Sequence, residues 1–184
     1  MKSIFLFISL SSVVAIVKAQ ELPEYNNSAT AWNSKTKISI PLTPEETVRK
    51  DKMNSAYKVP YGALFSKKAA VKTTMQLNGP KSKARITAAD TLRIFVKIDK
   101  DIDPVSVIKI YRATPIDNAR EVQVMQVSKK GDVERSDGDF MYFLKKLNPG
   151  VFQVNVLGTK ASDEILFYIG THESSLAKLT LGVD

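Results

Sequence analysis

Cysteine is absent from this chain of 184 residues, and histidine occurs once. The missing thiols exclude disulfide bonds, thiolate zinc sites, a cysteine nucleophile and a lipid-modified cysteine. A Ser-His-Asp triad would depend wholly on the one histidine, His172. The sequence also has no phosphate-binding glycine loop, no dinucleotide fingerprint and no G-x-S-x-G elbow. We therefore expect neither an enzyme nor a cofactor.

Long apolar runs are equally scarce, since the one that occurs stands at the start of the chain. Lys2 precedes the apolar residues 4–17, and Val17 and Ala19 occupy the −3 and −1 positions of a cleavage site. This order is typical of a secretory signal peptide. We expect residues 1–19 to be removed and the mature protein to be periplasmic or secreted. No later apolar run is long enough for a transmembrane segment.

Arginine and acidic residues are few relative to lysine. The chain has 27 basic and 19 acidic residues, a formal charge of +8, and 21 of the basic residues are lysines. Lysine-rich surfaces are strongly solvated, whereas the planar fork of arginine suits phosphate recognition, so we expect no nucleic-acid partner. The expected partner is a protein or glycan of the cell envelope or the extracellular space.

Helical periodicity is missing after residue 69, where short segments alternate apolar and polar side chains. In 91–98, for example, Leu92, Ile94 and Val96 fall on alternate positions. The segments expected to be strands are 71–77, 91–98, 105–111, 121–127, 140–147, 151–157, 164–169 and 176–183. About seven or eight such segments, separated by turn signals, predict an all-β antiparallel sandwich over 69–184.

The segment 20–68 is expected to be an N-terminal arm that precedes the sandwich. Residues 36–40 alternate as in a short strand. Residues 43–46 read Thr-Pro-Glu-Glu, which combines a capping threonine, a proline suited to the first helical turn and a capping-box glutamate. This combination predicts a short helix over 43–53.

A proline–glycine pair gives the sharpest local signal. Pro149 and Gly150 suit the two central positions of a type II turn. The surrounding segment 147–158, LNPGVFQVNVLG, resembles the entry to the penultimate strand of immunoglobulin-like and carboxypeptidase-regulatory-like sandwiches. The chain also resembles uncharacterised secreted immunoglobulin-like proteins of Gram-negative bacteria. The resemblance implies a fold and no activity, and Phe152 replaces the usual corner tyrosine, whose hydroxyl bond is therefore lost.

Three aspartates at alternate positions form the first candidate site. Asp99, Asp101 and Asp103 have the D-x-D-x-D spacing of a calcium loop. An EF-hand also requires glycine at loop position six and glutamate at twelve, where this chain has Pro104 and Ile110. A looser calcium site and a simple polar turn both remain open, because aspartate is favoured in turns.

Basic and acidic clusters supply two further alternatives to the leading hypothesis, a non-catalytic binding or structural domain of the cell envelope. Lys81, Lys83 and Arg85 alternate, so on an extended chain they point the same way and could contact an acidic glycan or lipid head group. A solvated strand edge would explain them equally. The carboxylates of 131–139 could serve a small hydrolase, if two of them faced each other across a cleft.

Overall fold

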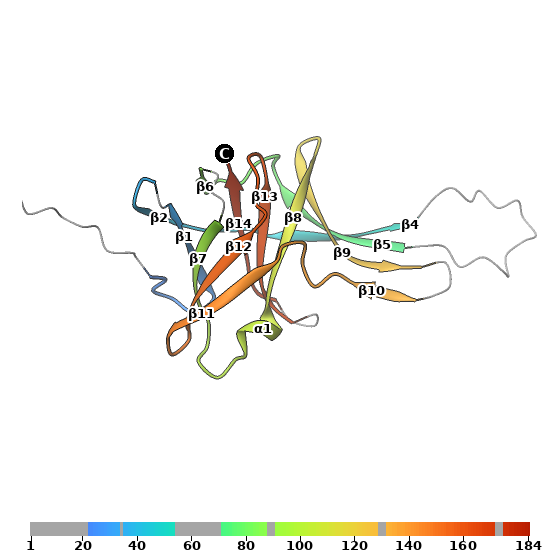
Figure 1. Ribbon diagram of the computed structural model, residues 1–184. Helices are drawn as coiled ribbons and strands as arrows, with labels where there is room; N and C mark the ends of the chain where they lie inside the picture. Colours follow the sequence, from blue (N-terminus) through green and yellow to red (C-terminus); the bar gives the residue numbers. More distant parts are fainter. Residues whose placement is uncertain (1–21, 34, 54–70, 88–90, 129–131, 172–174) are drawn as a thin grey trace, which may run out of the picture.

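The computed structural model describes residues 22–33, 35–53, 71–87, 91–128, 132–171 and 175–184. The predicted signal peptide over 1–19 and His172 therefore lie outside the described residues. The described chain is predominantly antiparallel β-structure in two sheets, which confirms the expected all-β class (Figure 1). Within these ranges, no helix is long and apolar enough to cross a membrane.

The smaller sheet has five antiparallel strands in the order β11-β12-β7-β1-β2. They are β1 (Ser28–Asn33), β2 (Ile38–Pro41), β7 (Thr91–Lys97), β11 (Tyr142–Asn148) and β12 (Val151–Leu157). The hairpins β1–β2 and β11–β12 lie on either side of β7, which pairs with β1 and β12. The segment before residue 69 thus contributes strands to this sheet.

The larger sheet has the order β3-β14-β13-β8-β9-β5-β4, with β6 added to β14 and β10 added to β9. Its strands are β3 (Thr43–Pro44), β4 (Thr47–Met53), β5 (Val71–Asn78), β6 (Arg85–Ile86), β8 (Ile108–Ile116), β9 (Ala119–Val127), β10 (Val133–Arg135), β13 (Glu164–Gly170) and β14 (Ser175–Val183). β8 pairs with β13 over Ile108–Ala113 but with β9 only over Thr114–Ile116. The sheet therefore curls, and β4, β5, β9 and β10 extend away from the stacked strands (Figure 1).

The main core lies between the smaller sheet and the β14-β13-β8 part of the larger one. Ile94 and Val96 of β7 and Ile165 and Phe167 of β13 are completely buried there. These residues alternate along their strands, as required when one face of each strand packs on another sheet. Burying each side chain of this kind contributes about 1.5–3 kcal/mol. The other face of β8 and β13 lies outside this core.

The helix predicted over 43–53 is wrong, because this segment forms β3 and β4. Thr43 pairs with Thr180 of β14, and Thr47 pairs with Leu77 of β5. Neighbouring strands thus give the backbone its hydrogen-bond partners, and a helix here would have had only a thin apolar face. Tertiary pairing overrides a local capping signature in such cases.

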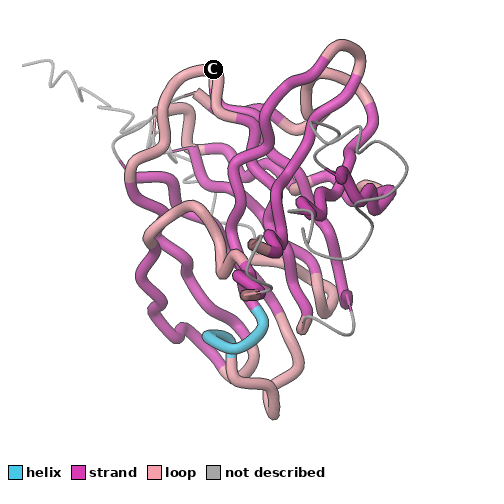
Figure 2. The backbone as a smooth tube through the Cα atoms, turned by 90° about the vertical axis from the view of Figure 1, so that its right-hand side faces the viewer, coloured by secondary structure: helices cyan, strands magenta, loops and turns pink. Residues whose placement is uncertain are grey.

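The strand predicted over 105–111 begins three residues later, because a short helix, α1 (Pro104–Val107), precedes it. The Asp103 carboxylate accepts a hydrogen bond from the Val105 N–H at 3.2 Å and caps this turn. Proline at the first helical position fits the same start. Figure 2 shows α1 in cyan at one end of the strands.

Candidate functional site

The curl of the larger sheet forms a hollow of about 540 Å³, which is lined from β4, β5, β8, β9, β10, β13 and β14. The lining residues are Thr47, Arg49, Thr73, Met75, Lys109, Tyr111, Val124, Met125, Arg135, Tyr168, Thr171 and Lys178. The hollow therefore lies on the opposite face of β8 and β13 from the main core. A concave, partly apolar surface with a few polar groups is the usual form of a ligand site.

Strand pairing sets the order of the side chains across the hollow. Tyr168 is paired with Lys109 of β8 on one side and with Lys178 of β14 on the other. On the extended part of the sheet, Arg49 of β4 is paired with Met75 of β5. Directly opposed side chains stand about 5 Å apart at their Cβ atoms, so each row combines a cation with an apolar or aromatic neighbour.

The lining carries one sign of charge. Its cations are Arg49, Lys109, Arg135 and Lys178, and the described residues place no carboxylate in the lining. Arg135 and Lys178 have no ion-pair partner among the residues that the structure describes. A cleft lined by one sign of charge attracts ligands of the opposite sign. The hollow is thus suited to an acidic group.

The other two cations are partly neutralised from outside the lining. The Lys109 ammonium lies 3.2 Å from the Asp137 carboxylate, and the Arg49 guanidinium lies 3.6 Å from Asp51. A hydrogen bond from Thr73 and the charge of Arg49 hold the pKa of Asp51 below its ordinary value, so this carboxylate stays ionised. We therefore assign the strongest attraction for an anion to the unpaired pair, Arg135 and Lys178.

Two tyrosines form the aromatic part of the floor. The rings of Tyr111 and Tyr168 meet edge to face with centroids 6.4 Å apart. The Tyr111 hydroxyl donates to the Ser136 carbonyl at 2.9 Å, and the Tyr168 hydroxyl donates to the Thr171 carbonyl at 2.8 Å. Burial, aided by the neighbouring Tyr168, raises the pKa of Tyr111. Both hydroxyl protons are thus already used; the Tyr111 ring is buried, and the partly exposed Tyr168 ring offers surface to a ligand.

An apolar layer closes the inner end of the hollow. Leu77, Val122 and Leu166 are completely buried, and they pack with Ala113 and Tyr111 into a second, smaller core. Each lies on the same face of its strand as a residue of the hollow, two positions away from it. The hollow is therefore a cup with an apolar base.

Beyond this base lies a group of buried charges, the Arg120 cluster, made of Arg120, Glu45, Ser82, Glu164 and Arg85. The Arg120 guanidinium is completely buried. It lies 2.6 Å from the Glu45 carboxylate, and it donates to the Ser82 hydroxyl at 2.6 Å and to the carbonyl oxygens of Asn78 and Gly79. Buried charges of this kind are tolerated only where they are paired and hydrogen-bonded.

Glu164 is the second anchor of the Arg120 cluster. Its carboxylate accepts hydrogen bonds from the Ser82 N–H and hydroxyl and from Arg85 at 2.7 Å. Burial raises the pKa of Glu164, but these hydrogen bonds outweigh burial and hold the pKa below its ordinary value. The cluster ties β6, β9 and β13 together at the end opposite the mouth of the cup.

The predicted basic cluster lies at this closed end. Lys81 and Lys83 are exposed, as the prediction of a polyanion contact requires. Arg85 is engaged in ion pairs with Glu164 and Asp184. The structure thus separates the two lysines from Arg85 in role, and it brings none of the three into the hollow.

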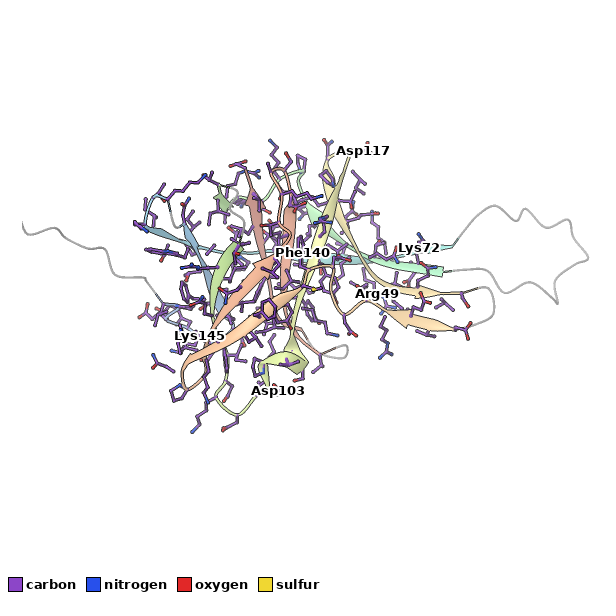
Figure 3. The ribbon with its side chains drawn as sticks, viewed as in Figure 1. Arg49, Lys72, Asp103, Asp117, Phe140 and Lys145 are labelled. Atoms are coloured by element: carbon purple, nitrogen blue, oxygen red, sulfur yellow. The ribbon has the colours of Figure 1, made fainter. Side chains whose placement is uncertain are left out.

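The three aspartates of the predicted calcium loop are exposed and serve the local backbone. Asp99 accepts a hydrogen bond from the Asp101 N–H at 3.2 Å, and Asp103 caps α1. Over the described ranges, no three acidic or histidine side chains converge in a way that could hold a metal ion. Figure 3 shows Asp103 at the bottom of the view, apart from Arg49 on the extended strands at the right.

The proline–glycine pair connects β11 to β12. Gly150 has φ +73°, and its carbonyl accepts a hydrogen bond from the Ile98 N–H at 2.9 Å. A Cβ atom at this position would lie 2.6 Å from the Ile98 carbonyl oxygen, so the backbones can approach only because the residue is glycine. Phe152, two residues after this turn, packs in the main core.

The acidic loop considered for hydrolysis holds its own neighbourhood together. Asp132 bonds with Ser128, Asp137 pairs with Lys109, and Asp139 accepts a hydrogen bond from the Arg112 N–H at 2.8 Å. The described lining of the hollow contains none of these carboxylates. The described residues of this loop therefore place no facing pair of carboxylates across the hollow.

The sequence did not point to Tyr111, Tyr168, Arg135 or Lys178 as a group. Alternation could have shown that Lys109 and Tyr111 share one face of a strand. It carried no signal for the curl that brings β4, β5 and β10 around that face. Comparisons with protein-family models, curated proteins and solved structures found no match.

Proposed function

We propose that this protein is an exported, non-catalytic binding protein that holds an acidic glycan or a lipid head group in the hollow of its curled sheet. One observation carries the proposal: four cations surround a floor of tyrosine and methionine, with no carboxylate in the described lining. Its two antiparallel sheets support an immunoglobulin-like sandwich as the scaffold, extended here by the curled part.

Arg135 and Lys178 suit the acidic group of the ligand. Charge-assisted hydrogen bonds from such side chains are about twice as strong as neutral ones. Tyr168 and Met75 offer apolar surface beside them, suited to a sugar face or the first carbons of an acyl chain. Carboxylate, sulfate and phosphate groups all bind such cations. The site therefore suits a ligand that has both an acidic group and an apolar part, and a glycan and a lipid can each supply one.

Export supports the same ligand class. The charged start, the apolar run and the cleavage site of residues 1–19 support delivery across a membrane, and the absence of cysteine is compatible with a mature protein in the periplasm or outside the cell. Acidic glycans and anionic lipids are the abundant polyanions in those compartments. Without residues 1–19, which hold Lys2 and Lys18, the chain has 25 basic and 19 acidic residues, and its formal charge of +6 favours encounter with both.

The proposal is tested by replacing Arg135 and Lys178 together with alanine. We expect binding of a sulfated oligosaccharide or of phosphatidylglycerol vesicles, measured by calorimetry and by sedimentation, to weaken about tenfold or more, because two charge-assisted contacts are lost. The matched control replaces Lys81 and Lys83, which removes the same charge at the closed end. It should change the affinity much less.

The two probes distinguish the two sources of the acidic group. Saturable binding of the oligosaccharide alone assigns the hollow to a glycan, and binding of the vesicles alone assigns it to a lipid head group. Equal losses in both double variants would mean that only net charge matters, and would overturn the assignment to the hollow. Tyr168→Ala adds a further check, since contact with the ring predicts weaker binding at unchanged net charge.

A further inference from the structure

The outer edge of β11 lies apart from the hollow. Across the part of the chain that the structure describes, β12 is the only strand that pairs with β11. We propose that this edge accepts an extended acidic segment of another protein as an added strand. Strand addition of this kind takes its affinity from main-chain hydrogen bonds and its specificity from alternate side chains.

The hydrogen-bond pattern between β11 and β12 shows which backbone groups of β11 point away from β12. The Leu157 N–H donates to the Met141 carbonyl at 3.0 Å, which makes these two residues a hydrogen-bonded pair at the start of β11. Bonded and outward positions alternate in an antiparallel pair. Leu144 and Lys146 therefore direct their N–H and C=O groups away from β12, where a partner strand can reach them.

Two exposed apolar side chains accompany this edge. Met141 is 74% exposed and Phe143 is 63% exposed, and they lie on the same face, two residues apart. Large apolar side chains seldom gather in the open without a partner to cover them. An added strand would place one of its apolar residues beside Phe143. The other long edge, β4, instead presents the four charged residues 49–52.

Lysines define the charge of the partner. Lys145 and Lys146 follow Phe143 and are both exposed, and neither takes part in an ion pair within the described ranges. Figure 3 shows Lys145 on β11, on the side of the molecule away from Arg49. A second copy of this chain would bring the same lysines and a net positive charge to the edge, which repels it. Lys146 lies on the opposite face of β11 from Phe143, so a segment with apolar residues beside Phe143 places its acidic residues beside Lys146.

A peptide of alternating glutamate and valine, seven residues long to match β11, is a suitable probe. We expect saturable binding by NMR titration, together with slowed hydrogen exchange at the Leu144 and Lys146 amides. A peptide with lysine in place of glutamate should bind about tenfold more weakly or worse, because like charges then meet at the edge.

Two substitutions separate the edge from the rest of the surface. Lys146→Pro removes an outward N–H group without removing a bond to β12, and it should abolish peptide binding while circular dichroism stays unchanged. Phe143→Asp places a negative charge beside the acidic peptide and should weaken binding several-fold. Val48→Asp, on the exposed face of β4, is the matched control and should leave binding unchanged.

Three outcomes would overturn the proposal. One is peptide binding that survives both Lys146→Pro and Phe143→Asp. Another is binding that is lost in the double alanine variant of Arg135 and Lys178 while the Leu144 amide stays unprotected, which would place the peptide in the hollow. The third is self-association on sedimentation with Leu144 already protected, which would assign the edge to a second copy. Failure here leaves the ligand of the hollow untouched.

Discussion

Strands β8 and β13 have two faces, and one of them holds the protein together while the other lines the hollow. On one face, Ile110 and Phe167 are completely buried under the five-stranded sheet. On the other, Lys109 and Tyr168 line a hollow that is covered only on its flanks. The same two strands therefore serve a dry core and an open site. Burial depends on what covers a face, and the curl leaves this one half covered.

The two faces are also closed by different chemistry. The inter-sheet face is filled by aliphatic and aromatic side chains, which gain stability simply by leaving water. The closed end of the cup is held by the Arg120 cluster, whose ions gain stability only while every partner is present. We expect the inter-sheet core to tolerate substitutions that change side-chain shape, and the Arg120 cluster to lose stability when one of its members is removed.

The largest expected effect comes from removing an aromatic ring from the dry face. Phe167→Ala should lower the free energy of unfolding by about 3–5 kcal/mol, because it leaves a cavity in a packed core. Tyr168→Ala, one residue later and on the open face, should lower it by about 1–2 kcal/mol. Urea unfolding of both variants measures the difference. Equal losses would mean that the hollow is as well packed as the core.

How far the sequence predicts the fold depends on the same contrast. Alternation of apolar residues identifies β7, β12 and β13, because one face of each strand is buried in the main core. It does not identify β4, where Arg49 to Lys52 are four successive charged residues. That strand exists because β5 supplies its backbone partners, and a local pattern cannot contain this information.

The candidate site shows the limit more clearly. Lys81, Lys83 and Arg85 stand out in the sequence because they lie close together. In the structure, however, Arg85 forms ion pairs with Glu164 and Asp184. Arg135 and Lys178 are 43 positions apart, and both line the same hollow only because the larger sheet curls. When sheet curvature brings the residues of a site together, their positions in the sequence show no regular spacing.

The second largest effect should come from the Arg120 cluster. Arg120→Met fills much of the same volume but leaves Glu45 and Glu164 buried with fewer partners, at a cost of about 3 kcal/mol. Arg49→Met, on the exposed rim, should change the free energy of unfolding by less than about 1 kcal/mol. Thermal unfolding compares the two. A neutral Arg120→Met would show that the cluster opens to water.

A smaller effect is expected at two glycines that have the same backbone angle. Gly150 and Gly158 both have φ +73°, but only Gly150 approaches another backbone, that of Ile98. Gly158→Ala should cost about 1 kcal/mol for the left-handed conformation alone. Gly150→Ala adds the close contact and should cost about 2 kcal/mol, within the range for local backbone strain. Chemical denaturation of both variants isolates the effect of that contact, and identical losses would contradict it.

The smallest effect is a pH dependence confined to the charged end of the cup. Because the pKa of Glu164 is lower in the folded protein than its ordinary value of 4.5, its ionisation stabilises the fold above that value. This contribution is lost as the pH falls through the lowered pKa. The loss is smaller than for Arg120→Met, since a protonated Glu164 keeps its place and Glu45 keeps its ion pair.

Urea unfolding between neutral pH and about pH 3 measures this contribution, since that window spans the ordinary pKa of a carboxyl group. Glu164→Gln should be less stable at neutral pH and should flatten the dependence below the ordinary pKa. The Arg85 hydrogen bond also lowers the pKa of Asp184, but this group is exposed, so Asp184→Asn should act weakly and only at low salt. The apolar face has no carboxyl group in its core to titrate. An acid transition unchanged in Glu164→Gln would therefore place the pH-sensitive group elsewhere and remove Glu164 as the anchor of the closed end.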